Sequence, residues 1–336
     1  MEQTFLAKFQ EFPLVFKPTV PGVDLLQWAA ANRELIENSV LSYGGVLFRG
    51  FDVPSPQYFQ HFATVVGESP VTYAANIFPL PETDKKSWRA ALIRPELRLK
   101  WHIDDSYDGF GGPKKIMFYS HLEAAEGGET PICDLRRMFQ SLDPEIRRKF
   151  VELGIVYVRN YYPQFGMDWR QEFGTTSPDE LEAICQRRQT ELEWVDGRLR
   201  TRAYRPAVIR HAKTGDTLWY NLVQMWHPLC NEPGVLASWR ASFKVDDYPM
   251  NVFYGDGSPI PDEVMEHIYS LYEKLGVSFL WQHSDIMVLD NFSTAHARKP
   301  FKGSRQLYVA LDKVLLLDEL PPGYQLRSQE WELNPV

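Results

Sequence analysis

The chain has 336 residues, and its hydrophobic share of 44% with an aromatic share of 14% supplies a large core, which excludes a disordered protein. Its 36 lysines and arginines are outnumbered by 44 aspartates and glutamates, and the net charge of -8 disfavours nucleic acid or an anionic membrane surface as a partner. Three cysteines without a paired spacing, and the lack of a signal-like start or a membrane-length apolar run, predict a cytoplasmic protein that does not cross a membrane.

The first part of the chain is predicted to contain two helices and short extended segments. Ser55 followed by Pro56 is an N-cap with proline at the first helical position, which predicts a helix that runs to about Val66. We expect His61, on this helix, to pack against neighbouring side chains. The other predicted elements are an extended lead-in at 13–18, an amphipathic helix at 23–38 and a buried strand at 44–51.

Residues 68–100 have the composition of a loop, because prolines interrupt them repeatedly. Loops carried on a rigid scaffold often supply substrate contacts. Asn76, Arg94 and Arg98 are therefore candidates for substrate contacts, and an ordinary surface loop is the alternative for each of them.

A candidate metal site follows directly after this loop. His102 and Asp104 stand two residues apart, and side chains at that spacing fall on the same side of an extended strand. Far downstream, the strand-like residues 285–291 lead to His296, which we expect to be the third ligand. Two histidines and one carboxylate on a single face are typical of non-haem Fe(II) oxygenases. By itself, the His-x-Asp tripeptide also fits a surface turn in which Asp104 is solvated.

The rest of the chain is predicted to alternate helices with short strands. Asp143-Pro144 and Ser177-Pro178 are helix-start signals, and Gly127-Gly128 marks a tight turn. We expect one domain over 1–336, mainly β with flanking helices, that carries a helical insertion at about 135–190. The predicted helices are 135–141, 143–153, 177–188 and 261–274, and the predicted strands are 114–121, 130–133, 155–159, 192–195, 207–211, 218–221, 276–280, one that ends before His296, and 305–315.

Further motifs occur in a fixed order between about residue 40 and residue 315. They are Ser106-Tyr107, Pro113-x-x-Ile116-x-Phe118-Tyr119, Gly127-Gly128-Glu129-Thr130-Pro131-Ile132-x-Asp134, Arg200-Thr201-Arg202, Arg205-Pro206-Ala207, Tyr248-Pro249-Met250-Asn251, Tyr254-Gly255-Asp256-Gly257, Trp281-Gln282 and His296-Ala297-Arg298-Lys299-Pro300-Phe301. Together they resemble the clavaminate synthase-like branch of the taurine dioxygenase (TauD/TfdA) family. So many motifs in one order are much harder to obtain by chance than one tripeptide.

The resemblance implies a fold, cofactors and site residues. Members of that family are Fe(II)- and 2-oxoglutarate-dependent oxygenases on a double-stranded β-helix, a jelly roll of the cupin kind. The resemblance implies His102, Asp104 and His296 as the catalytic metal ligands. It also implies that Arg305 holds the carboxylate of 2-oxoglutarate with help from Thr130. A guanidinium can form two parallel hydrogen bonds with a carboxylate, which the ammonium group of lysine cannot do. A surface charge at the edge of a strand is the alternative for Arg305.

Two positions refine the expected chemistry. Related halogenases have a small residue in place of Asp104, so halogenation is disfavoured, while many clavaminate synthase-like members carry glutamate there. Several amino-acid-oxidising relatives place a second arginine four residues beyond the first, where this chain has Val309. The substrate carboxylate is then held elsewhere or is not free. An aminoacyl group on a peptidyl carrier protein has no free α-carboxylate, and the segment that begins at His296 is similar to that of SyrP-like aspartyl hydroxylases.

Three further residues are candidates for substrate contact. Gln224 and His227 follow the strand-like residues 218–221, which in this family run close to the active site, and Arg298 lies two residues after His296. The remaining histidines are expected to pack or to lie at the surface, and they are His121, His211, His267 and His283.

The sequence thus predicts an oxygenase that uses Fe(II), 2-oxoglutarate and dioxygen to hydroxylate a small amino-acid-like substrate, free or carrier-tethered, in secondary metabolism. Desaturation or cyclisation with the same cofactors stays open, because pocket geometry decides the fate of the substrate. A non-catalytic barrel that binds a small molecule is the alternative from another class, and the intact metal-ligand set argues against it. A zinc hydrolase would need a general-base motif such as His-Glu-x-x-His, which the chain lacks.

Overall fold

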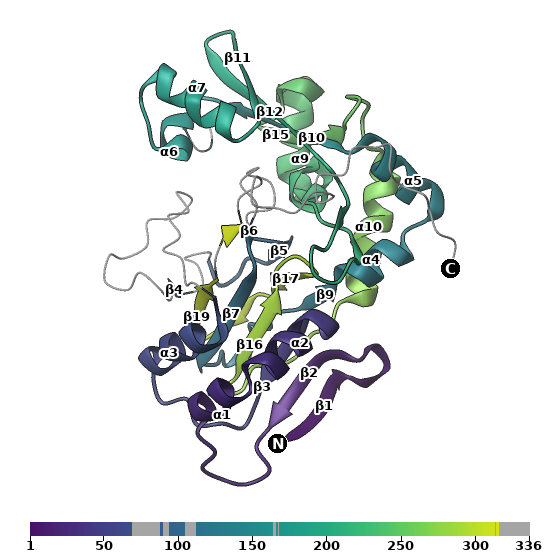
Figure 1. The fold of residues 1–336 in the computed structure, drawn as a ribbon. Helices are drawn as coiled ribbons and strands as arrows, with labels where there is room; N and C mark the ends of the chain where they lie inside the picture. Colours follow the sequence, from purple (N-terminus) through teal and green to yellow (C-terminus); the bar gives the residue numbers. More distant parts are fainter. Residues whose placement is uncertain are drawn as a thin grey trace.

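A computed structural model describes residues 1–68, 88–89, 94–104, 112–163, 166, 168–312 and 314–315. Its largest sheet has seven strands in the order β1-β2-β3-β16-β7-β19-β4 (Figure 1), and all neighbours are antiparallel except the parallel pair β2 and β3. The strands are β1 (Glu2–Ala7), β2 (Phe12–Lys17), β3 (Gly45–Phe48), β4 (Trp88–Arg89), β7 (Lys115–Leu122), β16 (Ile286–Asp290) and β19 (Gln306–Leu311).

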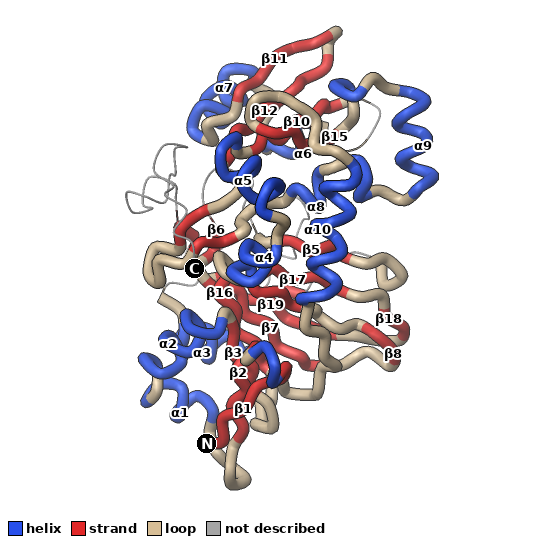
Figure 2. The backbone as a smooth tube through the Cα atoms, turned by 90° about the vertical axis from the view of Figure 1, so that its right-hand side faces the viewer, coloured by secondary structure: helices blue, strands red, loops and turns tan. Residues whose placement is uncertain are grey.

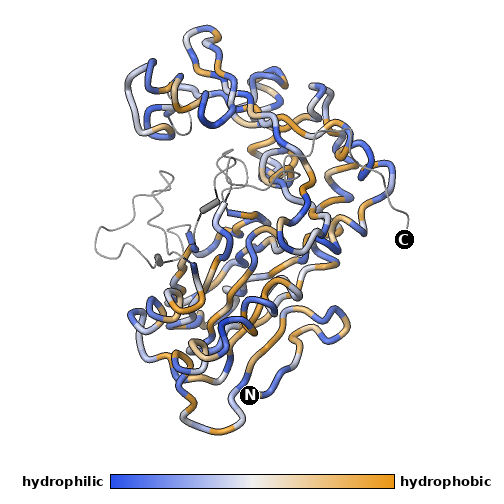
Figure 3. Tube along the Cα trace, viewed as in Figure 1, coloured by the Kyte–Doolittle hydropathy of each residue, from blue (hydrophilic) through white to orange (hydrophobic). Residues whose placement is uncertain are grey.

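The two faces of this sheet pack against different partners. Met117 and Val288 belong to a core that is shared with three helices on one face, whereas Phe118 and Met287 belong to a core on the other face. This alternation follows from the two-residue period of a strand, and Figure 3 shows the apolar character of these central strands. The three covering helices are α1 (Leu25–Ala31), α2 (Arg33–Tyr43) and α3 (Pro56–Val66).

Local capping signals predict several helix starts correctly. The Ser55 hydroxyl accepts a hydrogen bond from the N–H of Tyr58, and Asp143 and Ser177 cap their helices in the same way. The single helix predicted at 23–38 is wrong, because the chain breaks at Asn32, whose φ of -126° and ψ of 29° are not helical. The packing role expected of His61 is also wrong, since this residue is exposed.

A smaller antiparallel sheet in the order β5-β17-β9 faces the second core. It consists of β5 (Leu99–His102), β17 (Thr294–Arg298) and β9 (Ile132–Asp134), with α4 (Leu135–Ser141) and α10 (Asp262–Leu275) packed beside it (Figure 2). The strand predicted to end before His296 is in fact two strands, β16 and β17, and His296 lies inside the second. The strand predicted at 276–280 does not form, because Val277 makes only an isolated bridge to Ile132.

A four-stranded antiparallel sheet lies at the top of Figure 1. Its order is β11-β12-β10-β15, and α6 and α7 pack on it through a small aromatic and aliphatic core. The sequence prediction missed β12 and β15. The elements are β10 (Ile155–Tyr161), β11 (Glu191–Val195), β12 (Arg198–Arg205), β15 (Met250–Tyr254), α6 (Trp169–Phe173) and α7 (Pro178–Arg187).

The remaining elements complete an architecture of mixed sheets with flanking helices, as predicted. Within the part of the chain that the structure describes, no helix has both the length and the apolar character needed to cross a bilayer. The other helices are α5 (Pro144–Leu153), α8 (Val223–Trp226) and α9 (Pro233–Ser242), and the short strand pairs are β6 (Gly112–Pro113) with β20 (Val314–Leu315), β8 (Glu126–Gly127) with β18 (Phe301–Lys302), and β13 (Ile209–Arg210) with β14 (Thr217–Leu218).

Candidate metal centre

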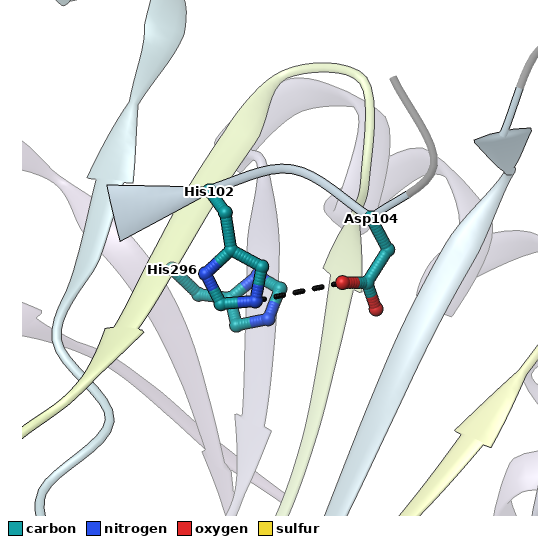
Figure 4. Close-up of side chains that lie close together, drawn as sticks. All are labelled: His102, Asp104 and His296. Carbon is teal, nitrogen blue, oxygen red and sulfur yellow. Dashed lines mark ion pairs between the residues drawn. The ribbon is translucent and has the colours of Figure 1, made fainter. Parts of the chain in front are cut away.

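The structure brings His102, Asp104 and His296 together (Figure 4). His102 ends β5, and its backbone partner across the sheet is His296 on β17, so the two imidazole rings lie 4.1 Å apart between centroids. Asp104 follows two residues later, with its Oδ1 3.5 Å from Nε2 of His102. Each of the three residues offers one ligand atom within 4.8 Å of the other two. Two nitrogens and one carboxylate oxygen at this spacing suit a first-row divalent metal.

The orientation of His102 is fixed by its other ring nitrogen. Nδ1 lies 2.8 Å from the carbonyl oxygen of Lys100, so Nδ1–H donates to that oxygen. The Nε2 atom, on the other side of the ring, faces the carboxylate of Asp104. A backbone carbonyl that holds the second nitrogen is a common support for a metal-ligating histidine.

The protonation states also suit a cation site. Burial, and then the charge of His102, hold the pKa of His296 well below its usual value, which keeps this imidazole neutral and able to ligate. Nδ1 of His296 is buried without a hydrogen-bond partner among the described residues. Burial raises the pKa of Asp104, partly offset by His102, so its charged form lacks adequate compensation from the protein. A divalent cation would supply that compensation, and the donor set therefore fits the metal implied by the sequence.

Asn291 supports the site in a way that the sequence analysis missed. Its side chain is fully buried, its Oδ1 accepts from the backbone N–H of Asp104 at 3.1 Å, and its Nδ2 donates to the backbone carbonyl of Asp104 at 3.0 Å. Asp104 lies outside β5, so no pairing among the described strands fixes its backbone. The side-chain amide of Asn291 holds the backbone of Asp104 instead. The sequence shows only that Asn291 follows the apolar strand β16, five residues before His296, and its contact with Asp104 could not be read from that position.

We expect Asn291→Ala to weaken metal binding about 10- to 100-fold, which is typical when a supporting group of a metal ligand is lost. The backbone of Asp104 would lose both of its side-chain partners, and its carboxylate would no longer be held in register with His102. Asn160→Ala is a matched control, because Asn160 is also buried and bonds to the backbone through its side-chain amide, which donates to the carbonyls of Asp246 and Tyr248. Equilibrium metal titration of both folded variants checks this, and equal affinities would contradict the role of Asn291.

Arg305 has the features of an anion-binding residue. Its Nε donates to the carbonyl oxygen of Gly128 at 3.2 Å, and its guanidinium lies 5.4 Å from the ring centroid of Phe301. Its Nη2 atom is buried without a hydrogen-bond partner among the described residues. Burial, and then the nearby charge of Arg298, lower the pKa of Arg305 to about 10. A ligand carboxylate would satisfy the Nη2 donor and offset this charge.

Thr130 lies two residues before Ile132, the backbone partner of His296 in the sheet. The residue is buried, and its hydroxyl oxygen accepts from Nε1 of Trp281 at 3.0 Å. This bond leaves the hydroxyl hydrogen of Thr130 available to a ligand. Trp281 entered the sequence analysis only as part of a motif, and its contact shows how the threonine is oriented.

Two of the candidate loop residues lie at the surface. Arg94 is exposed, and Arg98 is exposed with its Nη2 2.5 Å from Oε1 of Glu273. Asn76, the third candidate, lies outside the described residues. Substrate contact by these three side chains stays a prediction.

Arg298 is buried, and the structure shows two of its contacts. Its Nη2 donates to the backbone carbonyls of Arg94 and Leu97, at 2.9 and 2.8 Å. Arg298 lies on the same strand as His296, so it ties the segment that leads into β5 to the strand that carries the third histidine. These bonds give Arg298 a bracing role, and its predicted contact with substrate stays a prediction.

Gln224 and His227 are both buried and both bonded to backbone. Nε2 of Gln224 donates to the carbonyl oxygen of Trp101 at 3.0 Å, directly before His102. Nε2 of His227 lies 3.0 Å from the carbonyl oxygen of Ile260. Gln224 thus helps to place β5, and substrate contact by either residue stays a prediction.

Comparison with known proteins places this geometry in a family. Residues 9–311 match the model of the taurine catabolism dioxygenase TauD, TfdA family. The dapdiamide synthesis protein DdaC of Enterobacter agglomerans is 32% identical over 277 residues, which cover 82% of this chain and 84% of that protein. A clavaminate synthase-like protein of Arabidopsis thaliana is 25% identical over 321 residues, or 90% of this chain and 94% of that one.

Solved structures show the same fold at low sequence identity. PvcB of Pseudomonas aeruginosa is 16% identical with a TM-score of 0.55, and the match covers 91% of this chain and 88% of that one. A taurine dioxygenase of Burkholderia xenovorans is 18% identical with a TM-score of 0.50, covering 86% and 83%. The family model spans most of the chain and the His-Asp-His cluster lies within it, so this protein belongs to the TauD/TfdA family and is an Fe(II)- and 2-oxoglutarate-dependent dioxygenase.

Proposed function

We propose that His102, Asp104 and His296 hold Fe(II) and that Arg305 and Thr130 hold 2-oxoglutarate. The convergence of three ligand atoms within 4.8 Å of one another carries this proposal, and the buried Nη2 of Arg305 supports it. When bound, iron and 2-oxoglutarate supply an oxidation of a C–H bond coupled to decarboxylation of the cosubstrate. The chain's own part is to keep the His296 imidazole neutral, to orient Asp104 through Asn291, and to offer a guanidinium to the distal carboxylate.

The substrate that we propose is an amino acid or a carrier-tethered aminoacyl group of secondary metabolism, and the reaction is hydroxylation. DdaC, the relative at 32% identity, is by its name a protein of dapdiamide synthesis. Val309 lies on β19 and packs with the core that faces the metal centre, so an apolar side chain occupies the position where several relatives carry a substrate-binding arginine. A substrate whose carboxylate is bound in a thioester needs no such arginine. Desaturation or cyclisation by the same cofactors stays open.

Succinate release tests the tethered-substrate proposal. We expect aminoacyl groups on a peptidyl carrier protein to accelerate succinate formation well above the rate seen with the same free amino acids. The uncharged carrier protein is the control for non-specific activation. Equal acceleration by free and tethered amino acids would contradict the inference from Val309, without affecting the assignment of the iron ligands.

We also infer that the seven-stranded sheet and the β5-β17-β9 sheet form the two layers of a double-stranded β-helix. The shared core that contains Phe118, Met287 and Ile132 supports this, because it lies between the two sheets. In the same proposal the whole chain is one domain, and the elements at about 135–190 are an insertion in it.

A further inference from the structure

A buried histidine and a buried aspartate meet beside the turn that joins β16 to β17. Nε2 of His211 lies 3.1 Å from Oδ2 of Asp290, and the two side chains are only 7% and 5% exposed. Asp290 is the last residue of β16, whereas His211 directly follows β13. Both residues are separate from the three metal ligands. The turn beside them carries Asn291, however, and the amide of Asn291 holds the backbone of Asp104.

The tautomer of His211 is fixed by the backbone on the other side of its ring. Nδ1 accepts from the backbone N–H groups of Lys213 and Thr214, at 3.3 and 3.1 Å. A ring nitrogen that accepts hydrogen bonds from N–H groups carries no hydrogen itself, so the hydrogen of this imidazole is on Nε2. Nε2–H therefore donates to Oδ2 of Asp290. His211 thus links the turn after β13 to the turn after β16 in one defined orientation.

The carboxylate of Asp290 holds the middle of the turn between β16 and β17. Its Oδ1 accepts from the backbone N–H of Phe292 at 2.9 Å, and its Oδ2 accepts from the hydroxyl of Ser293 at 2.9 Å. Asn291 lies in the sequence between Asp290 and these two partners, so both bonds close around it. A buried carboxylate needs hydrogen-bond donors, and His211 supplies one from outside the turn. The position of this carboxylate therefore sets the course of the backbone at Asn291.

The two ends of the turn are held by bonds that do not involve His211. The backbone N–H of Asp290 and the hydroxyl of Thr294 both donate to the carbonyl oxygen of Gly44, at 3.0 and 2.8 Å. These bonds remain when the side chain of His211 is replaced, so the strands on both sides of the turn should stay paired. Loss of the His211 donor should then change the orientation of the Asp290 carboxylate and the centre of the turn without unfolding the sheet.

We propose that His211 and Asp290 are positioning residues of the metal centre. His211 orients the carboxylate of Asp290, and Asp290 orients the turn around Asn291. The side-chain amide of Asn291 in turn holds the backbone of Asp104 beside His102. The inference rests on the proposed metal centre and deepens it, because the metal affinity then depends on a hydrogen bond that lies outside the set of ligands.

Two substitutions of His211 separate this role from a role in stability alone. The side-chain oxygen of asparagine can replace Nδ1, but its amide is too short to reach Asp290. His211→Asn should therefore keep the turn after β13 and lower the Fe(II) affinity about tenfold, the lower end of the range for a supporting group. The longer amide of glutamine can replace Nε2–H, so His211→Gln should keep the bond to Asp290 and most of the affinity. Anaerobic Fe(II) titration measures this order, and wild-type affinity in His211→Asn would overturn the proposal.

Two aspartates of the same strand provide a matched control. Asp285 directly precedes β16 and Asp290 ends it, both side chains are buried, and Asp285 is paired with Arg49 as Asp290 is with His211. Asp290→Asn should lower the Fe(II) affinity as His211→Asn does, because an amide places an N–H group against donors. Asp285→Asn should lower the stability of the chain and leave the Fe(II) affinity unchanged. Equal losses of affinity in the two aspartate variants would contradict a positioning role.

The metal-free chain gives a readout that does not depend on iron. The ¹H–¹⁵N NMR signals of the Asn291 side-chain amide should move in His211→Asn and stay in place in Asp285→Asn. A wild-type chain that binds no Fe(II) would overturn the proposed metal centre. Normal Fe(II) binding by the wild-type chain, together with unmoved Asn291 signals in His211→Asn, would overturn the present inference alone.

Discussion

A His296→Ala variant should bind Fe(II) at least about 100-fold more weakly than the wild-type chain and should release no measurable succinate. Loss of a group that supports a metal ligand already lowers the metal affinity about 10- to 100-fold, so removal of one of the three ligands should lower it at least as much. His296 is only 4% exposed and lies directly across the sheet from His102, and among the described residues the group able to hold a metal consists of these two histidines and Asp104. Equilibrium metal titration and a succinate assay measure the two effects.

His267→Ala is the control for this variant. His267 accepts a hydrogen bond from the backbone N–H of Asp143 and lies on α10, so its loss affects stability without touching the three ligands. We expect it to keep wild-type iron affinity. Stoichiometric, tight iron binding by His296→Ala would refute the assignment of His296.

Arg305→Gln has the second largest expected effect, and it acts on the cosubstrate. A hydrogen bond between two charged groups contributes about 1.5–3 kcal/mol, so the affinity for 2-oxoglutarate should fall roughly 10- to 100-fold. The substitution removes the charge and the buried Nη2 donor but leaves the iron ligands intact. The dissociation constant of 2-oxoglutarate should therefore rise while iron affinity stays unchanged.

Two further variants test whether the effect on 2-oxoglutarate binding is specific to the guanidinium of Arg305. Arg305→Lys keeps the charge but loses the planar fork, so its affinity should fall between those of the wild-type chain and the glutamine variant. Arg98→Gln removes an exposed arginine that pairs with Glu273, and it should leave 2-oxoglutarate binding unchanged. If Arg305→Gln binds 2-oxoglutarate as tightly as the wild-type chain, the cosubstrate is held elsewhere.

The sequence was most informative where short-range chemistry decides the structure. A serine or aspartate before a proline marked the starts of α3, α5 and α7, because the capping bond involves residues only two or three positions apart. The His-x-Asp spacing similarly predicted two side chains on one side of the chain. The strand-like residues before His296 suggested it as the third ligand and the family resemblance agreed, but the register that pairs His296 with His102 depends on residues far apart in the sequence.

Other features depend on tertiary contacts that no local pattern encodes. The strand β12 was missed although Leu199, Thr201 and Ala203 alternate with arginines. Its arginines are stabilised by distant partners, as in the contact of Arg200 with Asp247 on the segment before β15. The bracing contacts of Arg298 and the amide of Asn291 belong to the same class, because their backbone partners lie about 190 to 200 residues away along the chain.

The most direct test of the account is the visible absorption of the anaerobic protein after addition of Fe(II) and 2-oxoglutarate. If the three ligands and Arg305 hold iron and cosubstrate together, a weak charge-transfer band should develop and saturate with 2-oxoglutarate. The band should be missing in His296→Ala and should need more 2-oxoglutarate in Arg305→Gln. A wild-type protein that binds iron but gives no band, or an unchanged band in His296→Ala, would contradict the proposed centre.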